Sequence, residues 1–176
     1  MKFFIFKLFI VLLYLISSTS SYSIERPNIK NLLVYNEPKK LENFDFKNIK
    51  NDIVELSNFN NKLIVLNFWA TWCAPCKEEM PSLDLLQEHK NLDNLKIFAI
   101  NIGQDNLENS KKFFGDLKIK NLGIYFDTPT TLAKKFGLRG IPTSILLNKD
   151  GLEFARIVGS INFSEKKFID WLAKYN

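Results

Sequence analysis

The stretch that decides the fold runs from Leu63 to Pro81 and reads LIVLNFWATWCAPCKEEMP. It opens with an apolar run broken only by Asn67, which predicts a strand covered on both faces. After Cys73 the apolar residues recur at steps of three and four, so we expect one buried face of a helix that extends to about His89. The two cysteines of this stretch therefore stand where a buried strand gives way to a helix.

The segments on either side continue the alternation of strands and helices. Asp-Gly at 150–151 is a strong hairpin signal between two strands. Asn162, with Glu165 three residues later, predicts the start of the last helix. We expect a hairpin at 44–56, strands at 63–69, 95–102, 123–126, 142–147 and 154–158, and helices at 73–89, 107–114, 130–136 and 162–175. This order favours an α/β fold with a mixed central sheet, helices on both faces and an N-terminal hairpin extension.

The N-terminal 43 residues differ in character from the rest of the chain. Residues 1–23 have the order of a signal peptide, with lysines ahead of an apolar run and small polar residues after it. Because that run is shorter than the about 20 residues that span a bilayer, we favour cleavage over a membrane anchor. Residues 24–43 are polar and contain two prolines, and we interpret them as an extension or linker. Residues 44–176 then form one domain.

Composition and charge exclude several classes of protein. The 176 residues are 46% hydrophobic and 24% charged, as in ordinary globular proteins, which argues against a disordered, collagen-like or coiled-coil chain. The net charge of +5 comes from basic residues that are scattered rather than gathered in a patch. We therefore expect no nucleic-acid partner, and we expect a monomer.

Cys73 and Cys76 are the only cysteines, and their spacing predicts redox chemistry. A disulfide that closes so short a loop is worth only about 2 kcal/mol by chain entropy, so it would be a poor staple. A helix N-terminus places backbone N–H groups beside Cys73 and favours its thiolate. That thiolate can open a partner's disulfide, and Cys76, one turn away, can then displace the partner.

These residues resemble the thioredoxin superfamily, and more closely its TlpA/ResA-like group of exported thiol-disulfide oxidoreductases. The resemblance is carried by residues 66–81, LNFWATWCAPCKEEMP, and is supported by GIPT at 140–143. The order of elements agrees over 44–176. The family implies a thioredoxin-like fold and a periplasmic location, in an exported compartment where disulfides persist.

The resemblance also assigns roles to individual residues. It implies a nucleophilic Cys73, a resolving Cys76, and a cis peptide bond between Ile141 and Pro142 that faces the disulfide. Proline lacks an N–H, so the backbone of Ile141 is free to pair with an extended substrate segment. We expect Ile141, with Trp72 and Pro75, to contact the substrate.

A buried acidic group is expected at a different place from that in many thioredoxins. Those proteins commonly carry an aspartate six residues before the first cysteine, where this chain has Asn67, and an amide cannot accept the proton. In the TlpA/ResA-like group an acidic residue three positions after the second cysteine can serve near the thiols. Glu79 occupies that position, and we expect it to act as a proton relay.

No metal or cofactor is expected. The one histidine, His89, lies at the far end of the predicted helix, and two cysteines with one distant histidine fall short of a structural zinc site. The expected partners are a membrane thiol that donates electrons and a client protein with cysteines. Cytochrome c maturation is the best-known client process of the family, but Thr143 stands where the cytochrome branch often has an acidic residue, so general reduction or copper-site assembly remains open.

Two other classes of function compete with the oxidoreductase. The first is a Cu(I) chaperone, because paired thiolates can bind a soft ion; however, Trp72 stands where metallochaperones usually have methionine. Copper titration of the reduced protein would decide this. The second is a binding module with incidental cysteines, in which Cys73→Ala would leave cellular function intact.

Overall fold

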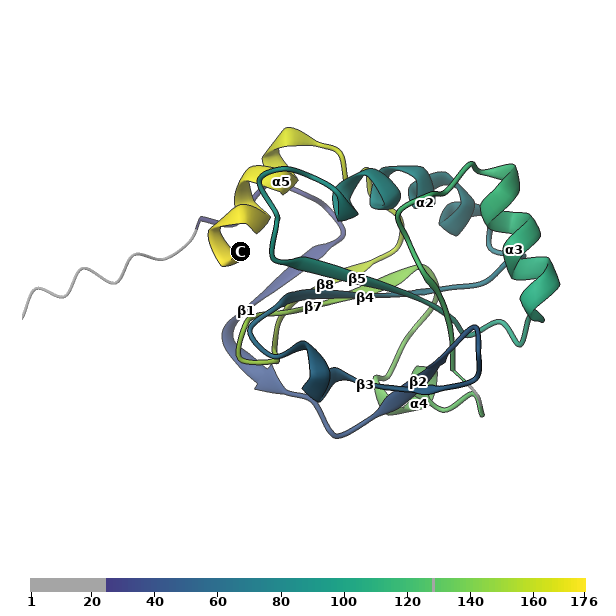
Figure 1. Cartoon of the computed structure of the whole chain (residues 1–176). Coiled ribbons are helices and arrows are strands. Elements are labelled where there is room, and N and C mark those ends of the chain that lie inside the picture. The colour runs from purple at the N-terminus through teal and green to yellow at the C-terminus, as the bar shows by residue number, and fades with distance from the viewer. Residues whose placement is uncertain (1–24, 128) are drawn as a thin grey trace, which may run out of the picture.

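The computed structural model describes residues 25–127 and 129–176, which form an eight-stranded mixed sheet with helices on both faces (Figure 1). The strand order is β1-β8-β7-β4-β5-β6-β2-β3. The strands are β1 (Leu32–Lys40), β2 (Asp45–Asn48), β3 (Ile53–Glu55), β4 (Leu63–Trp69), β5 (Leu95–Asn101), β6 (Ile124–Phe126), β7 (Thr143–Leu147) and β8 (Leu152–Val158). The helices are η1 (Leu56–Phe59), α2 (Ala74–Gln87), α3 (Leu107–Asp116), α4 (Leu132–Lys135), α5 (Lys166–Leu172) and η2 (Ala173–Tyr175).

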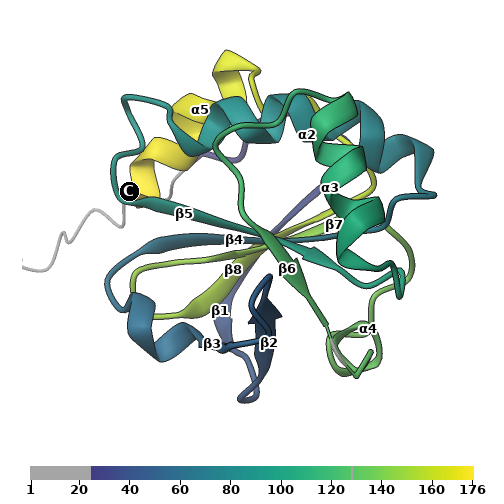
Figure 2. The ribbon, with the colours of Figure 1, turned by 45° about the vertical axis from the view of Figure 1, so that its right-hand side comes forward.

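The central strand β4 is buried along its whole length, as its apolar run predicts. Successive side chains of a strand point to opposite faces, so β4 contributes to two cores. Val65 and Trp69 pack with side chains of α2, α3 and α5. Leu66 and Phe68 pack with the β2–β3 hairpin and α4 on the other face. Figure 2 shows the three larger helices above the sheet, with the hairpin and α4 below it. Asn67 shares the face of Val65 and Trp69, toward α2.

Strand direction brings three element ends to one edge of the sheet. β4 is parallel to β5 and antiparallel to β7. The end of β4, the end of β5 and the start of β7 therefore meet at the same edge, and α2 begins there. The fold class, including the N-terminal hairpin of β2 and β3, is confirmed.

Residues 24–43 are not merely the expected linker, because they include β1. This strand pairs antiparallel with β8, and Leu32 at its start is fully buried. Its pairing is irregular between Val34 and Lys39, a stretch that contains Pro38. Proline is tolerated on an edge strand or at a bulge. The alternation that would reveal a strand in the sequence is lost because most of β1 is exposed.

The last helix begins later than the Asn162 signal predicts. α5 starts at Lys166, and the Asn162 side chain accepts a hydrogen bond from the backbone N–H of Ser164 at 3.0 Å, within a turn. That turn allows Phe163, which is fully buried, to enter the core, while its N–H donates to the Ser82 hydroxyl at 3.0 Å. Tertiary packing of one aromatic side chain thus overrides the local capping signal.

The predicted signal peptide or membrane anchor at 1–23 lies outside the described residues. Within the described ranges, none of the helices is long and apolar enough to cross a membrane.

Candidate active site

A disulfide joins Cys73 and Cys76 at the start of α2. Cys73 is the N-cap residue of α2, and its Sγ accepts a hydrogen bond from the backbone N–H of Cys76 at 3.2 Å. The N–H groups and the positive dipole end of a helix N-terminus stabilise an anionic sulfur. Cys73 is 5% exposed whereas Cys76 is 0% exposed. Cys73 is therefore the cysteine that a partner can reach, and Cys76 lies behind it.

Trp72 and Pro75 are exposed side chains next to the cysteines. Trp72, directly before Cys73, is 68% exposed, which is unusual for so large an apolar group. Pro75 lies exposed in the first turn of α2, where its missing N–H costs no helical hydrogen bond. The side chains of Trp72 and Pro75 therefore form an exposed apolar surface next to the disulfide.

The peptide bond between Ile141 and Pro142 is cis, as the resemblance implies. It directly precedes β7, whose first residues pair with the last residues of β4, so it lies at the edge of the sheet where α2 begins. Thr143 is buried, and its hydroxyl donates a hydrogen bond to the carbonyl of Gly140 at 2.7 Å. The Pro142 carbonyl accepts from the N–H of Gly159 at 2.9 Å.

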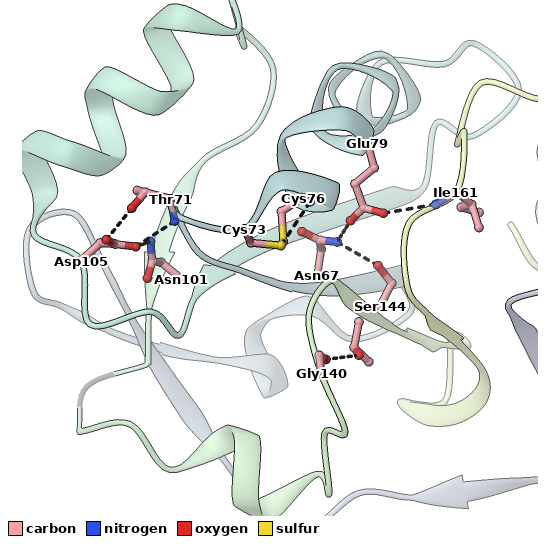
Figure 3. The surroundings of a disulfide bond; sticks show 11 residues. Asn67, Thr71, Cys73, Cys76, Glu79, Asn101, Asp105, Gly140, Ser144 and Ile161 are labelled. Carbon is pink, nitrogen blue, oxygen red and sulfur yellow. Dashed lines mark hydrogen bonds between the residues drawn. A yellow bond between two sulfur atoms is a disulfide. The ribbon is translucent and has the colours of Figure 1, made fainter.

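Glu79 is buried one turn after Cys76, with 2% exposure. Its Oε1 accepts from Nδ2 of Asn67 at 2.7 Å, and its Oε2 accepts from the N–H of Ile161 at 3.4 Å (Figure 3). Burial raises the pKa of Glu79 from 4.5 to about 8, although both hydrogen bonds oppose the shift. A carboxyl group with a pKa near neutrality can both hold and release a proton under physiological conditions.

Asp105, in the loop after β5, forms a second polar cluster beside the cysteines. Its carboxylate accepts from the N–H and hydroxyl of Thr71, at 2.9 and 2.6 Å, and from Nδ2 of Asn101 at 2.9 Å. Burial raises the pKa of this carboxyl group, but the hydrogen bonds from Thr71 and Asn101 outweigh that effect and lower it below 3.8. The ionised Asp105 therefore ties the β5–α3 loop to the turn that carries Trp72.

A residue without a side chain lets this loop approach the turn closely. A Cβ atom on Gly103 would lie 2.5 Å from Cβ of Ala70 and 3.0 Å from Nε1 of Trp72. Real Cβ contacts are not that short, so glycine is required by the approach.

Comparison with known proteins identifies the chemistry of this pair. A family model described as Redoxin matches residues 37–167. The chain therefore belongs to the Redoxin family. It is 29% identical over 124 residues to the thiol-disulfide oxidoreductase ResA of Bacillus subtilis (strain 168), covering 69% of this chain and 67% of that protein. It is 31% identical over 121 residues to ResA of Bacillus thuringiensis subsp. konkukian (strain 97-27), covering 69% of each chain.

The fold of this Redoxin family member also matches solved structures. The structure of a secreted thiol-disulfide isomerase from Corynebacterium glutamicum aligns with a TM-score of 0.69 and 22% identity, covering 88% of this chain and 98% of the other. The resemblance to the TlpA/ResA-like group is thus confirmed, and the chain is a thioredoxin-like thiol-disulfide oxidoreductase. Its redox-active pair is Cys73 and Cys76.

Sequence reasoning found some residues of this site and missed others. Cys73, Cys76 and Glu79 lie together as expected, whereas Ser144 and Asp105 were not foreseen. Asp105 follows the end of β5, which is parallel to β4, so its place after a neighbouring strand was a usable signal. Ser144 lies opposite Asn67 in the β4–β7 pairing, and that register is a tertiary property with no local signal.

Proposed function

We propose that this oxidoreductase acts in the periplasm as a reductant, taking electrons from a membrane thiol and passing them to cysteines of client proteins. The observation that carries the proposal is the placement of the two sulfurs: Cys73 caps α2 and keeps a small exposed area, whereas Cys76 lies behind it and has none. The secreted relative supports a location outside the cytoplasm. The segment 1–23, proposed as the export signal, lies outside the described residues.

The proposed cycle conserves atoms and electrons. In the reduced protein the Cys73 thiolate attacks a client disulfide, forming a mixed disulfide and releasing one client sulfur as a thiolate that takes up a proton. Cys76 then loses its proton and attacks Sγ of Cys73, which releases the second client sulfur and forms the Cys73–Cys76 disulfide. The client gains two electrons, and the donor dithiol restores the reduced pair by the reverse exchange.

Glu79 is proposed to carry the proton that Cys76 gains and loses. Residues three apart on a helix lie on one face, which places Glu79 beside Cys76 over β4. Because burial raises its pKa to about 8, Glu79 holds a proton beside the disulfide at neutral pH. It can give this proton to Cys76 when the donor opens the disulfide, and take it back when Cys76 attacks.

Exposed groups around the sulfurs are proposed to hold the client. Trp72 and Pro75 offer apolar contact, and the backbone of Ile141, held by the cis bond to Pro142, offers hydrogen bonds to an extended segment. Thr143 is buried and bonded to Gly140, so this position presents no charge to the client. The clients proposed for this surface belong to cytochrome c maturation, copper-site assembly or general disulfide reduction.

Trapping of the mixed disulfide tests the function. In cells that express Cys76→Ala, clients should accumulate as disulfide adducts on Cys73, which mass spectrometry of the purified protein would identify. The double variant Cys73→Ala/Cys76→Ala is the control and should capture none. If no Cys73-linked adduct forms, the exchange mechanism is wrong.

The direction of electron flow has a separate readout. Rapid acid quenching and alkylation of the wild-type protein in cells should show mostly reduced Cys73 and Cys76 if it acts as a reductant. A fully oxidised pair would contradict the reductant role while leaving exchange itself intact.

A further inference from the structure

The side-chain amide of Asn67 has hydrogen-bond partners for its nitrogen but none, among the described residues, for its oxygen. Its Nδ2 donates to Oε1 of Glu79 at 2.7 Å and to Oγ of Ser144 at 3.0 Å, which uses both N–H hydrogens. Its Oδ1 is buried, and none of the described residues donates a hydrogen bond to it. In Figure 3 the nitrogen of this amide points toward Glu79 and the oxygen points toward the disulfide.

An unpaired buried acceptor is costly, by about 1 to 3 kcal/mol, and so calls for an explanation. A disulfide has no hydrogen to donate, so in the oxidised protein the cysteines cannot satisfy Oδ1 of Asn67. Reduction leaves Cys73 as the favoured thiolate and gives Cys76 an S–H group, and a thiol is a weak hydrogen-bond donor. The acceptor therefore matches a group that exists only in the reduced protein.

Cys76 is the thiol that fits. It is fully buried, and it lies on the same face of α2 as Glu79, which already contacts the Asn67 amide. Cys73 is less suitable, because its sulfur caps α2 and is the nucleophile that must be ionised and free to reach a client.

We propose that Asn67 is a positioning residue whose Oδ1 accepts a hydrogen bond from the Cys76 thiol in the reduced protein, while its Nδ2 holds Glu79. Ser144, opposite Asn67 in the pairing of β4 with β7, keeps the amide oriented with its oxygen toward the sulfurs. This proposal rests on the proposed function, because it requires that the pair be reduced during the cycle.

The hydrogen bond from the Cys76 thiol to Asn67 sets the order in which the two cysteines react. An acceptor for S–H stabilises the thiol over the thiolate, so Cys76 stays protonated while Cys73 attacks the client. Glu79 became a carboxylate when it gave its proton to Cys76 at the opening of the disulfide, and once the mixed disulfide has formed it takes that proton back. The resulting thiolate then forms the S–S bond with Cys73, and the client sulfur leaves with the bonding electron pair.

The test uses the full chain with Cys73→Ser, which leaves Cys76 as its single thiol. Its S–H stretching band in the infrared should lie below that of a thiol without a hydrogen bond. Asn67→Leu should shift the band to higher frequency, whereas Asn67→Asp, which keeps an acceptor oxygen, should leave it low. Ser144→Ala should broaden or split the band, because the amide loses the group that orients it.

Ser110→Ala is the matched control, because Ser110 is also a buried serine that accepts from a strand asparagine, Asn101, at 3.3 Å. It should leave the band unchanged. An identical band with and without Asn67→Leu, measured in folded protein, would overturn the proposal. Because the band is read without any exchange reaction, that result would leave the client-trapping experiment and the proposed function standing. Loss of client trapping with a normal band shift would instead refute the function.

Discussion

Glu79 and Asp105 are two carboxyl groups that each accept a hydrogen bond from a strand asparagine beside the same disulfide, yet their pKa values move in opposite directions. Asp105 is half-buried and receives three short hydrogen bonds, so its charged form is favoured. Glu79 is buried and receives one short and one long bond, so desolvation dominates. Although both carboxyl groups pair with an asparagine, Asp105 is ionised at neutral pH whereas Glu79 holds a proton.

The difference teaches how one site separates support from chemistry. Asp105 remains ionised throughout the neutral range, and its charge holds the Trp72 turn in place. Glu79 can change its charge near neutral pH, and it stands where Cys76 must gain and lose a proton. Changing either carboxyl group should therefore alter a different property.

The largest effect is expected from Glu79→Gln, which keeps the shape but cannot accept a proton. The release of a trapped client by Cys76 should slow by about 100-fold at pH 7, the lower range of general acid–base contributions. Stopped-flow fluorescence of the mixed-disulfide reaction would measure it. Glu78→Gln, a neighbouring exposed position on α2, is the control and should react at the normal rate. Equal rates for both variants would remove Glu79 from the mechanism.

The pH dependence of folding stability gives a second test of whether Glu79 is protonated. Because the folded pKa of about 8 exceeds the ordinary 4.5, the native state holds a proton that the unfolded chain releases. The Glu79 contribution to stability should be fully present below pH 4.5 and should be lost as pH rises through about 8, by a total on the order of 5 kcal/mol. Glu79→Gln should abolish this slope in denaturant titrations.

A smaller effect is expected from Asp105→Asn, because Asp105 is partly solvated. The substitution replaces the charged acceptor that faces Thr71 and Asn101 with a neutral amide, which should cost about 1 kcal/mol of folding stability. Since the pKa of Asp105 is lowered, the wild-type contribution is present above 3.8 and is lost as pH falls through the lowered value. Hydrogen exchange of the Thr71 amide should become faster in the variant, and an unchanged rate would show that Asp105 does not hold the turn.

The sequence alone predicts most elements of this fold because their apolar patterns are strong and local. The β4 run, the helix after Cys73 and the Asp-Gly hairpin before β8 all follow from nearest neighbours in the chain. β1 could not be predicted in this way, because it is an irregular edge strand whose partner, β8, lies at the other end of the domain.

The candidate site likewise contains features that the sequence predicts and features that depend on tertiary packing. The cysteine pair follows from its spacing, and the cis bond at Pro142 follows from the family resemblance. The burial of Glu79 and its contact with Asn67 follow only from the packing of α2 on β4, and the contact of Asn67 with Ser144 depends on strand register. The sequence shows Asn67 only as the replacement of an acid, whereas its hydrogen bonds to Glu79 and Ser144 are visible only in three dimensions.

Titration of the carboxyl carbons by NMR tests the central contrast most directly, because one sample of the oxidised wild-type protein reports on both groups. We predict that Glu79 titrates with a pKa of about 8 while Asp105 titrates below 3.8. If Glu79 instead titrates near 4.5, it holds no proton beside the disulfide at neutral pH, and the account of its role is wrong.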